Sequence, residues 1–151
     1  MKIVSGGQTG VDRAALDFAM ANGLEHGGWC PRGRLAEDGV IPLRYALTET
    51  DTTDYAERTE RNVLDSDATV IVTRTLPLAG GTLLTEQCAR KHGKPSLTLS
   101  EQQGAAAGAA VAQFLNRHSP FTLNVAGPRE SEAPGIGRFV REVLAAVLSK
   151  A

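Results

Sequence analysis

The sequence predicts an α/β domain whose mostly parallel sheet is covered by helices on both faces. Apolar runs with strand character alternate along the chain with segments of helical periodicity, which is the pattern of such domains. Glycine-rich turns follow two of the strands and lead directly into helices. The strongest strand signal, at residues 68–73, is β-branched and uninterrupted, as expected of a parallel strand buried on both faces. A chain of 151 residues fits one ligand-binding domain over residues 1–151.

Individual elements follow from periodicity and from residues that begin and end helices. From Val11 the apolar residues recur at helical spacing until Gly23, which is typical of the position just after a helix. Asp51 and Asp54 offer N-caps for a later helix. The predicted order is strand 3–5, helix 11–22, a short strand near 45–48, helix 51–64, strand 68–73, helix 82–92, strand 96–99, helix 102–116, strand 121–125 and an amphipathic helix over 136–148.

Composition limits the classes of function. With 16 basic and 17 acidic residues and a net charge of -1, the chain lacks the field that holds nucleic acid or an anionic membrane, so we expect neither partner. Cys30 and Cys88 stand in no CxxC or zinc-ligand spacing, so we expect reduced thiols of open role and no structural metal. The N-terminal segment reaches glycine too early for a signal peptide, and no apolar run has membrane-span length; these features predict a cytoplasmic protein.

Two glycine-rich loops carry the strongest functional signal. Residues 6–10 (GGQTG) and 79–82 (AGGT) each leave the carboxyl end of a predicted strand and enter a helix. Glycine lets the backbone approach a ligand, and the free N–H groups at a helix N-terminus favour phosphate. Thr9 and Thr82 add hydroxyl donors. One such loop can be a turn that binds nothing, but two from neighbouring strands favour a phosphorylated ligand, although neither has dinucleotide or P-loop spacing.

Residues beside the loops have two interpretations each. Asp12 either contacts the ligand or compensates the helix dipole, while Arg13 follows it and has the geometry to grip an anion bidentately. Arg32 and Arg34, near Trp29, fit a phosphate clamp with a stacked aromatic ring. They fit equally well a solvated basic loop in which the indole packs over the core.

The long irregular segment 27–51 holds a further candidate. A loop of this length inside a compact domain is usually functional. Glu37 and Asp38 within it either accept hydrogen bonds from a heterocycle or pair with the nearby arginines.

Helical positions supply the remaining candidates. Arg58 and Asn62 share one polar face with Tyr55 and Thr59, and spacing alone favours a solvent-exposed face. Glu86, after the second glycine loop, is either a general base or a compensation of the helix dipole. We assign no histidine to catalysis, because none has an acid at a useful spacing.

Several long blocks closely resemble the molybdenum carrier protein family. They are residues 5–17 (SGGQTGVDRAALD), 28–39 (GWCPRGRLAEDG), 55–62 (YAERTERN), 67–69 (DAT), 80–82 (GGT) and Thr85. The likeness runs in order from about residue 3 to residue 99. It implies a three-layer Rossmann-like fold, in a group that also holds lysine-decarboxylase-like phosphoribohydrolases and the DNA-processing protein DprA.

This resemblance implies a protein that binds, stores or carries molybdenum cofactor, a pterin with a terminal phosphate and a dithiolene-bound metal. Residues 6–13 and 80–82 would hold the phosphate, and residues 29–39 with Arg58 and Asn62 would line the rest of the pocket. The expected partners are molybdoenzymes or cofactor-biosynthesis proteins, and the expected assembly is a homodimer or homotetramer. The predicted cofactor-binding residues are Gly6, Gly7, Gln8, Thr9, Gly10, Asp12, Arg13, Trp29, Arg32, Arg34, Glu37, Arg58, Asn62, Gly80, Gly81, Thr82 and Thr85.

The alternative is a nucleotide-binding protein or a phosphoribohydrolase-like enzyme acting on nucleoside monophosphates. The phosphoribohydrolases carry a PGGxGTxxE motif, whereas this chain has LAGGTLLTE at residues 78–86. Ala79 replaces the proline, and a glycine is missing before Thr82. Catalysis would therefore depend on Glu86 alone, and we expect a binding protein rather than an enzyme.

Overall fold

The computed structural model describes residues 1–148 and confirms the α/β prediction. Its central sheet is wholly parallel, with strand order β2-β1-β9-β7-β8. The strands are β1 (Lys2–Val4), β2 (Glu25–Gly27), β7 (Ala68–Thr73), β8 (Ser96–Ser100) and β9 (Thr122–Ala126). Every residue of β7 is buried, because β8 and β9 pair with its two edges and helices cover both its faces.

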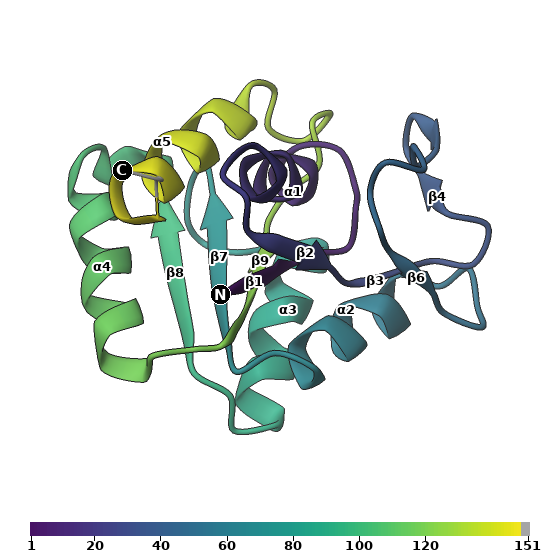
Figure 1. Ribbon diagram of the computed structural model, residues 1–151, viewed down its shortest axis with the longest axis horizontal. Helices are drawn as coiled ribbons and strands as arrows, with labels where there is room; N and C mark the ends of the chain where they lie inside the picture. The colour runs from purple at the N-terminus through teal and green to yellow at the C-terminus, as the bar shows by residue number, and fades with distance from the viewer. Residues whose placement is uncertain (149–151) are drawn as a thin grey trace.

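Helices cover the sheet in two layers, so the fold has three layers (Figure 1). One layer contains α1 (Val11–Ala21), α4 (Ala106–His118) and α5 (Ile136–Leu148), whose apolar faces join the strands in the main core. The other contains α2 (Tyr55–Leu64) and α3 (Gly80–Lys91), which pack against each other. The apolar stripe predicted for the last helix is the buried face of α5, which begins at Ile136 as predicted.

Strand order creates the position for a site. The chain moves from β1 to β2 in one direction along the sheet and from β7 to β8 in the other. β9 fills the place between β1 and β7. The carboxyl ends of these three strands therefore meet where the order reverses, which is where open parallel sheets bind ligands.

The structure differs from the predicted elements in two places. The edge strand β2 was not predicted; it pairs with β1 alone. The predicted helix 102–116 is wrong as one element, because a short 3-10 helix η1 (Glu101–Gln103) ends at Gly104 with a φ of 55° before α4 begins. Of the N-caps predicted for the next helix, Asp54 is the one used: α2 begins at Tyr55, and the Asp54 carboxylate accepts from Ala56 N at 2.9 Å.

Residues 28–54 form an excursion that leaves the sheet after β2 and returns at α2 (Figure 1). The segment was predicted to be irregular with one short strand near residues 45–48. It contains instead two small strand pairs, β3 (Trp29–Cys30) with β6 (Thr48–Glu49), and β4 (Leu35–Ala36) with β5 (Gly39–Val40).

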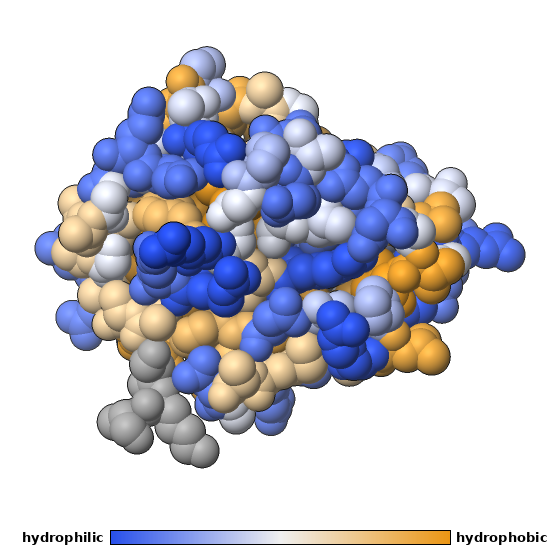
Figure 2. Space-filling view, turned by 90° about the horizontal axis from the view of Figure 1, so that it is seen from above, coloured by the Kyte–Doolittle hydropathy of each residue, from blue (hydrophilic) through white to orange (hydrophobic). Residues whose placement is uncertain are grey.

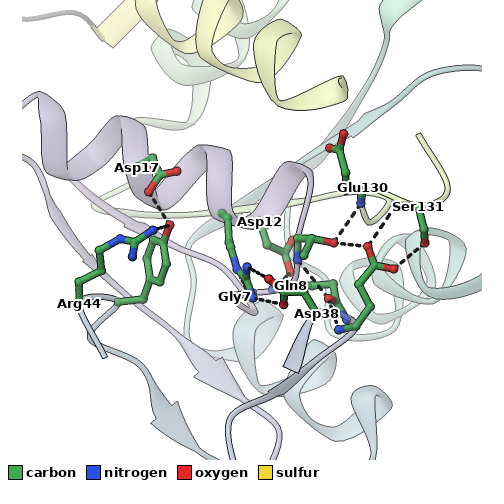
Figure 3. Close-up of polar contacts among 12 residues, drawn as sticks. Gly7, Gln8, Asp12, Asp17, Asp38, Arg44, Glu130 and Ser131 are labelled. Carbon is green, nitrogen blue, oxygen red and sulfur yellow. Dashed lines mark hydrogen bonds and ion pairs between the residues drawn. The ribbon is translucent and has the colours of Figure 1, made fainter. Parts of the chain in front are cut away.

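Polar contacts hold the excursion in place. The Arg34 guanidinium donates to the carbonyl groups of four residues within the excursion, which are Ile41, Pro42, Tyr45 and Leu47. The Tyr45 hydroxyl donates to Asp17 of α1 at 2.7 Å and accepts from the guanidinium of Arg44 at 3.0 Å (Figure 3).

Exposed apolar side chains gather on the excursion. Val40 is 68% exposed and Leu43 is 84% exposed, and Figure 2 shows orange residues at the end of the molecule that the excursion forms. Within residues 1–148, no helix has both the length and the apolar character needed to cross a membrane.

Candidate functional site

A cavity of about 90 Å³ lies at the carboxyl ends of β1 and β9. Its walls come from the first glycine loop, α2, the start of α3 and the segment after β9. Its lining includes Gly6, Gln8, Asp12, Tyr55, Arg58, Asn62, Gly81, Thr82, Thr85, Arg129 and Glu132. The cavity therefore joins the two predicted glycine loops with a third loop that the sequence did not suggest.

A buried ion pair forms the floor of the cavity. Arg58 Nη1 lies 2.9 Å from Asp12 Oδ2, and the two side chains are 13% and 4% exposed. The same carboxylate oxygen accepts from the backbone N–H of Gln8 at 3.2 Å. Gly6 is required here, since a Cβ atom would lie 1.5 Å from Arg58 Nη1. Burial raises the pKa of Asp12, and the neighbouring Arg58 only partly offsets this effect.

Two buried donors, each on a residue that lines the cavity, lack partners among residues 1–148. They are Nε2 of Gln8 and Nε of Arg58. The other end of the Gln8 amide is fixed, because its Oε1 accepts from the backbone N–H groups of Thr9 at 3.1 Å and Glu37 at 2.9 Å. Buried donors normally have acceptors, so both nitrogens favour a ligand that presents oxygen atoms.

Tyr55 and Arg129 form another wall of the cavity. The guanidinium carbons of Arg58 and Arg129 each lie 5.5 Å from the centre of the Tyr55 ring, a distance at which a cation and an aromatic face attract each other. Arg129 Nε also pairs with Glu132 at 3.1 Å. Two guanidinium groups at the cavity therefore lie against the same aromatic ring.

The second glycine loop presents an open helix end. No side chain of residues 1–148 caps the N-terminus of α3, and Gly81 and Thr82 of its first turn line the cavity. Thr85 is directed back into the helix, where its hydroxyl donates to Gly81 O at 3.0 Å. The uncapped N–H groups and the helix dipole favour an anion at this side of the cavity.

The tip of the first glycine loop lies outside the cavity. Gly7, Thr9 and Gly10 do not line it, because the segment after β9 covers the start of α1. Val11 N donates to Pro128 O at 3.3 Å, and a Cβ atom on Gly10 would lie 2.6 Å from that oxygen. The Thr9 hydroxyl donates to Glu37 and accepts from Glu130 N.

Arg13 and Glu37 make contacts within the protein instead of lining the cavity. The Arg13 guanidinium binds both carboxylate oxygens of Asp38, at 2.5 and 2.7 Å. Glu37 accepts from Thr9, and from both the backbone N–H and the hydroxyl of Ser131. These contacts fasten the excursion to the first loop and to the segment after β9 (Figure 3).

The aromatic and basic residues of the excursion also lie away from the cavity. Trp29 Nε1 donates to Asp65 at 2.7 Å, and the Arg61 guanidinium carbon lies 4.7 Å from the centre of a Trp29 ring. Arg32 is exposed, and Arg34 binds backbone carbonyl groups as described above. Asn62 does reach the cavity wall, yet its amide pairs with the Trp29 backbone, at 2.7 Å through Oδ1 and 3.0 Å through Nδ2.

Glu86 was predicted to be a general base or to compensate the helix dipole, but α3 begins at Gly80, so Glu86 lies beyond the first helical turn. Its carboxylate lies 3.4 Å from Arg90 Nη2, one turn further along the helix. Glu86 does not line the cavity and Gly80 stands outside it as an exposed residue. The acids that face the cavity are Asp12 and Glu132.

Three features of the site were not predicted as such. Tyr55 was noted only as part of a polar helix face. Arg129 and Glu132 follow β9, and the sequence signal that could have identified them is the Ala-Gly-Pro turn at residues 126–128. Gly127 allows the close approach, since a Cβ atom there would lie 2.2 Å from Val72 O.

We expect acid to loosen the contacts of Glu37. Hydrogen bonds from Ser131 and Thr9 hold the pKa of Glu37 below its ordinary value. The contribution of Glu37 to stability is therefore complete above its ordinary pKa. It is lost as the pH falls through the lower pKa that Glu37 has in the folded protein. Glu37→Gln should increase amide hydrogen exchange in residues 128–131 at neutral pH. Equal exchange in the variant and the parent protein would show that these bonds do not hold the segment.

The parallel three-layer architecture places the protein in the Rossmann-like class of α/β proteins. The chain belongs to the circularly permutated YpsA SLOG family, whose model matches residues 3–148. It is also 44% identical to "Putative molybdenum carrier protein" from Syntrophus aciditrophicus SB, known from a crystal structure at 1.45 Å resolution. The two structures agree with a TM-score of 0.95, over 98% of this chain and 94% of that one. The search among curated proteins finds no match.

Proposed function

We propose that the protein binds molybdenum cofactor, the phosphorylated molybdopterin, and serves as its carrier or store. The observation that carries the proposal is the cavity, whose lining includes Gln8 and Arg58, each with a buried donor that lacks a partner, and the uncapped N-terminal turn of α3. Oxygen atoms of a phosphate satisfy donors of this kind. The Syntrophus protein, at 44% identity, is named as a molybdenum carrier, and this name supports a ligand that contains molybdenum.

The size of the cavity limits what it encloses. Pockets that bury a whole small molecule measure roughly 300–1,000 Å³, while this one measures about 90 Å³. The enclosed space therefore suits the terminal phosphate, and the pterin would extend over the open side. Within residues 1–148, no three His, Cys, Asp or Glu side chains gather as a metal site. The dithiolene would hold the molybdenum, which is cargo here.

Binding without chemistry is what these residues support. Arg58 and Gln8 would grip phosphate oxygens, and Arg129 would lie over the entrance on the Tyr55 ring. Other parts of the same proposal are a cytoplasmic location, a homodimer or homotetramer, and molybdoenzymes or cofactor-biosynthesis proteins as recipients. Light scattering coupled to size exclusion would test the assembly.

An anaerobic titration with purified molybdopterin, with and without molybdenum, tests the main proposal. We expect saturable binding, slower oxidative decay of the bound pterin, and competition by inorganic phosphate. Bovine serum albumin at equal concentration controls for nonspecific protection. A protein that binds inorganic phosphate but neither form of the pterin would contradict the carrier function and leave the anion site standing.

A nucleotide is the second candidate, because the enclosed space would hold only a phosphate group and a nucleoside monophosphate presents the same group. The position of Glu86 outside the cavity gives no support to hydrolysis of its glycosidic bond. Thermal-shift measurements with nucleotides and molybdopterin separate the two. A ligand at a hundredfold its Kd adds about 2.7 kcal/mol to the free energy of unfolding, so the preferred ligand should give the larger shift.

A further inference from the structure

The charges that line the cavity cancel in two pairs. Arg58 pairs with Asp12 at 2.9 Å, and Arg129 pairs with Glu132 at 3.1 Å. The cavity is therefore close to neutral before a ligand enters. An oxyanion that takes hydrogen bonds from Arg58 must share this cation with Asp12, and two adjacent anions then face each other in a desolvated place. Like charges so placed favour protonation of one of them.

Asp12 is the group that is suited to take the proton. Its side chain is only 4% exposed, whereas that of Glu132 is 60% exposed and keeps its solvation. Cations from two elements act on Asp12: Arg58 on α2 and, more weakly, Arg13 on α1, whose guanidinium is held by Asp38. The Gln8 backbone N–H also faces it. No histidine lines this cavity.

We propose that an oxyanion binds this cavity together with one proton, which the Asp12 carboxylate takes from solvent. The inference rests on the proposed function, in that the cavity must hold a phosphate-like group. The proton forms an O–H bond on one Asp12 oxygen, and the buffer acid that releases it becomes its conjugate base. The new carboxyl group can donate to the oxyanion, so that Arg58 and Asp12 both become donors to the ligand.

The sign of the pH dependence follows from this exchange. Burial already raises the pKa of Asp12, and Arg58 lowers it. A bound anion draws Arg58 away and adds negative charge, so the pKa of Asp12 is higher in the complex than in the free protein. The affinity for the oxyanion should therefore rise as the pH falls through the pKa that Asp12 has in the complex. It should level off below the pKa that Asp12 has in the free protein.

Sulfate is the appropriate probe, because it remains a dianion over the working pH range and brings no titrating proton of its own. Calorimetric titrations in two buffers of different ionisation enthalpy, at one mildly acidic pH, give the number of protons taken up. The parent protein should take up a substantial fraction of one proton per sulfate. Asp12→Asn, which keeps the size of the side chain, should take up none while still binding sulfate.

Each of the other possible results would overturn the proposed proton uptake. Sulfate binding with identical heats in both buffers would overturn the proton coupling and leave the anion site in place. Uptake that persists in Asp12→Asn and disappears in Glu132→Gln would place the proton on Glu132 and also overturn it. Failure of the parent protein to bind either sulfate or inorganic phosphate would overturn the proposed function together with this inference.

Discussion

Replacing Arg58 by methionine should lower the affinity for a phosphorylated ligand by about 30- to 1,000-fold. A charged hydrogen-bonding group in a desolvated site contributes about 2–4 kcal/mol when it is removed, and about 1.4 kcal/mol corresponds to a factor of ten. Arg58 is 13% exposed and donates into the cavity floor. Methionine keeps most of the apolar stem, so the loss reports on the guanidinium group and not on packing.

The matched control is Arg61→Met on the same helix. Arg61 is 42% exposed and stacks over Trp29, away from the cavity, so this change should leave the affinity within about threefold of the parent value. Calorimetric titration with inorganic phosphate and with molybdopterin measures both variants. Equal losses in the two variants would indicate that only the general charge of α2 matters and would remove Arg58 from the site.

Folding of Arg58→Met needs a separate measurement, because the change leaves Asp12 buried without its partner. Breaking a buried pair in this way costs about 3–5 kcal/mol, reduced here by protonation of the carboxyl group. Arg58→Met combined with Asp12→Asn removes both charges and should recover part of that stability in urea unfolding. It should not recover the affinity, which separates binding from folding.

Local sequence signals were sufficient to predict an element whose structure depends on its own residues. The amphipathic repeat of residues 136–148 correctly predicted the start of α5 at Ile136. Gly23, with a φ of 68°, follows the end of α1 as predicted. By contrast, β2 is a strand because β1 offers it an edge, and its Glu-His-Gly sequence has little strand propensity of its own.

The candidate site shows the same division. The glycine loops could be found from sequence because turn geometry and helix ends are local. Arg129 lies in the site because β9 is inserted between β1 and β7, and no local pattern encodes the order of strands. Arg13 and Arg34 were also predicted to bind the ligand, yet Arg13 pairs with Asp38 and Arg34 donates to backbone carbonyl groups. The partner of an arginine depends on contacts far along the chain.

Gly28→Ala should destabilise the protein by about 2–6 kcal/mol, a large part of the roughly 5–15 kcal/mol typical of a folded domain. Gly28 has a φ of 127°, and a Cβ atom there would lie 2.2 Å from Ser5 O and 3.1 Å from Asn62 Oδ1. Backbone strain at such a φ costs about 1–3 kcal/mol, and forced overpacking costs about 1–3 kcal/mol more. The chain has no room to move, because Asn62 holds the next residue, Trp29, through two hydrogen bonds.

Gly39→Ala separates strain from overpacking. Gly39 has a φ of 114°, and a Cβ atom there would meet nothing within 4 Å, so this variant carries the strain alone. Both substitutions restrict the unfolded chain equally, and that effect cancels in the comparison. The urea midpoint of Gly28→Ala should therefore lie well below that of Gly39→Ala. Equal midpoints would mean that the backbone at the end of β2 can shift to accommodate the added Cβ atom. The close approach of Gly28 to Ser5 would then not anchor the excursion.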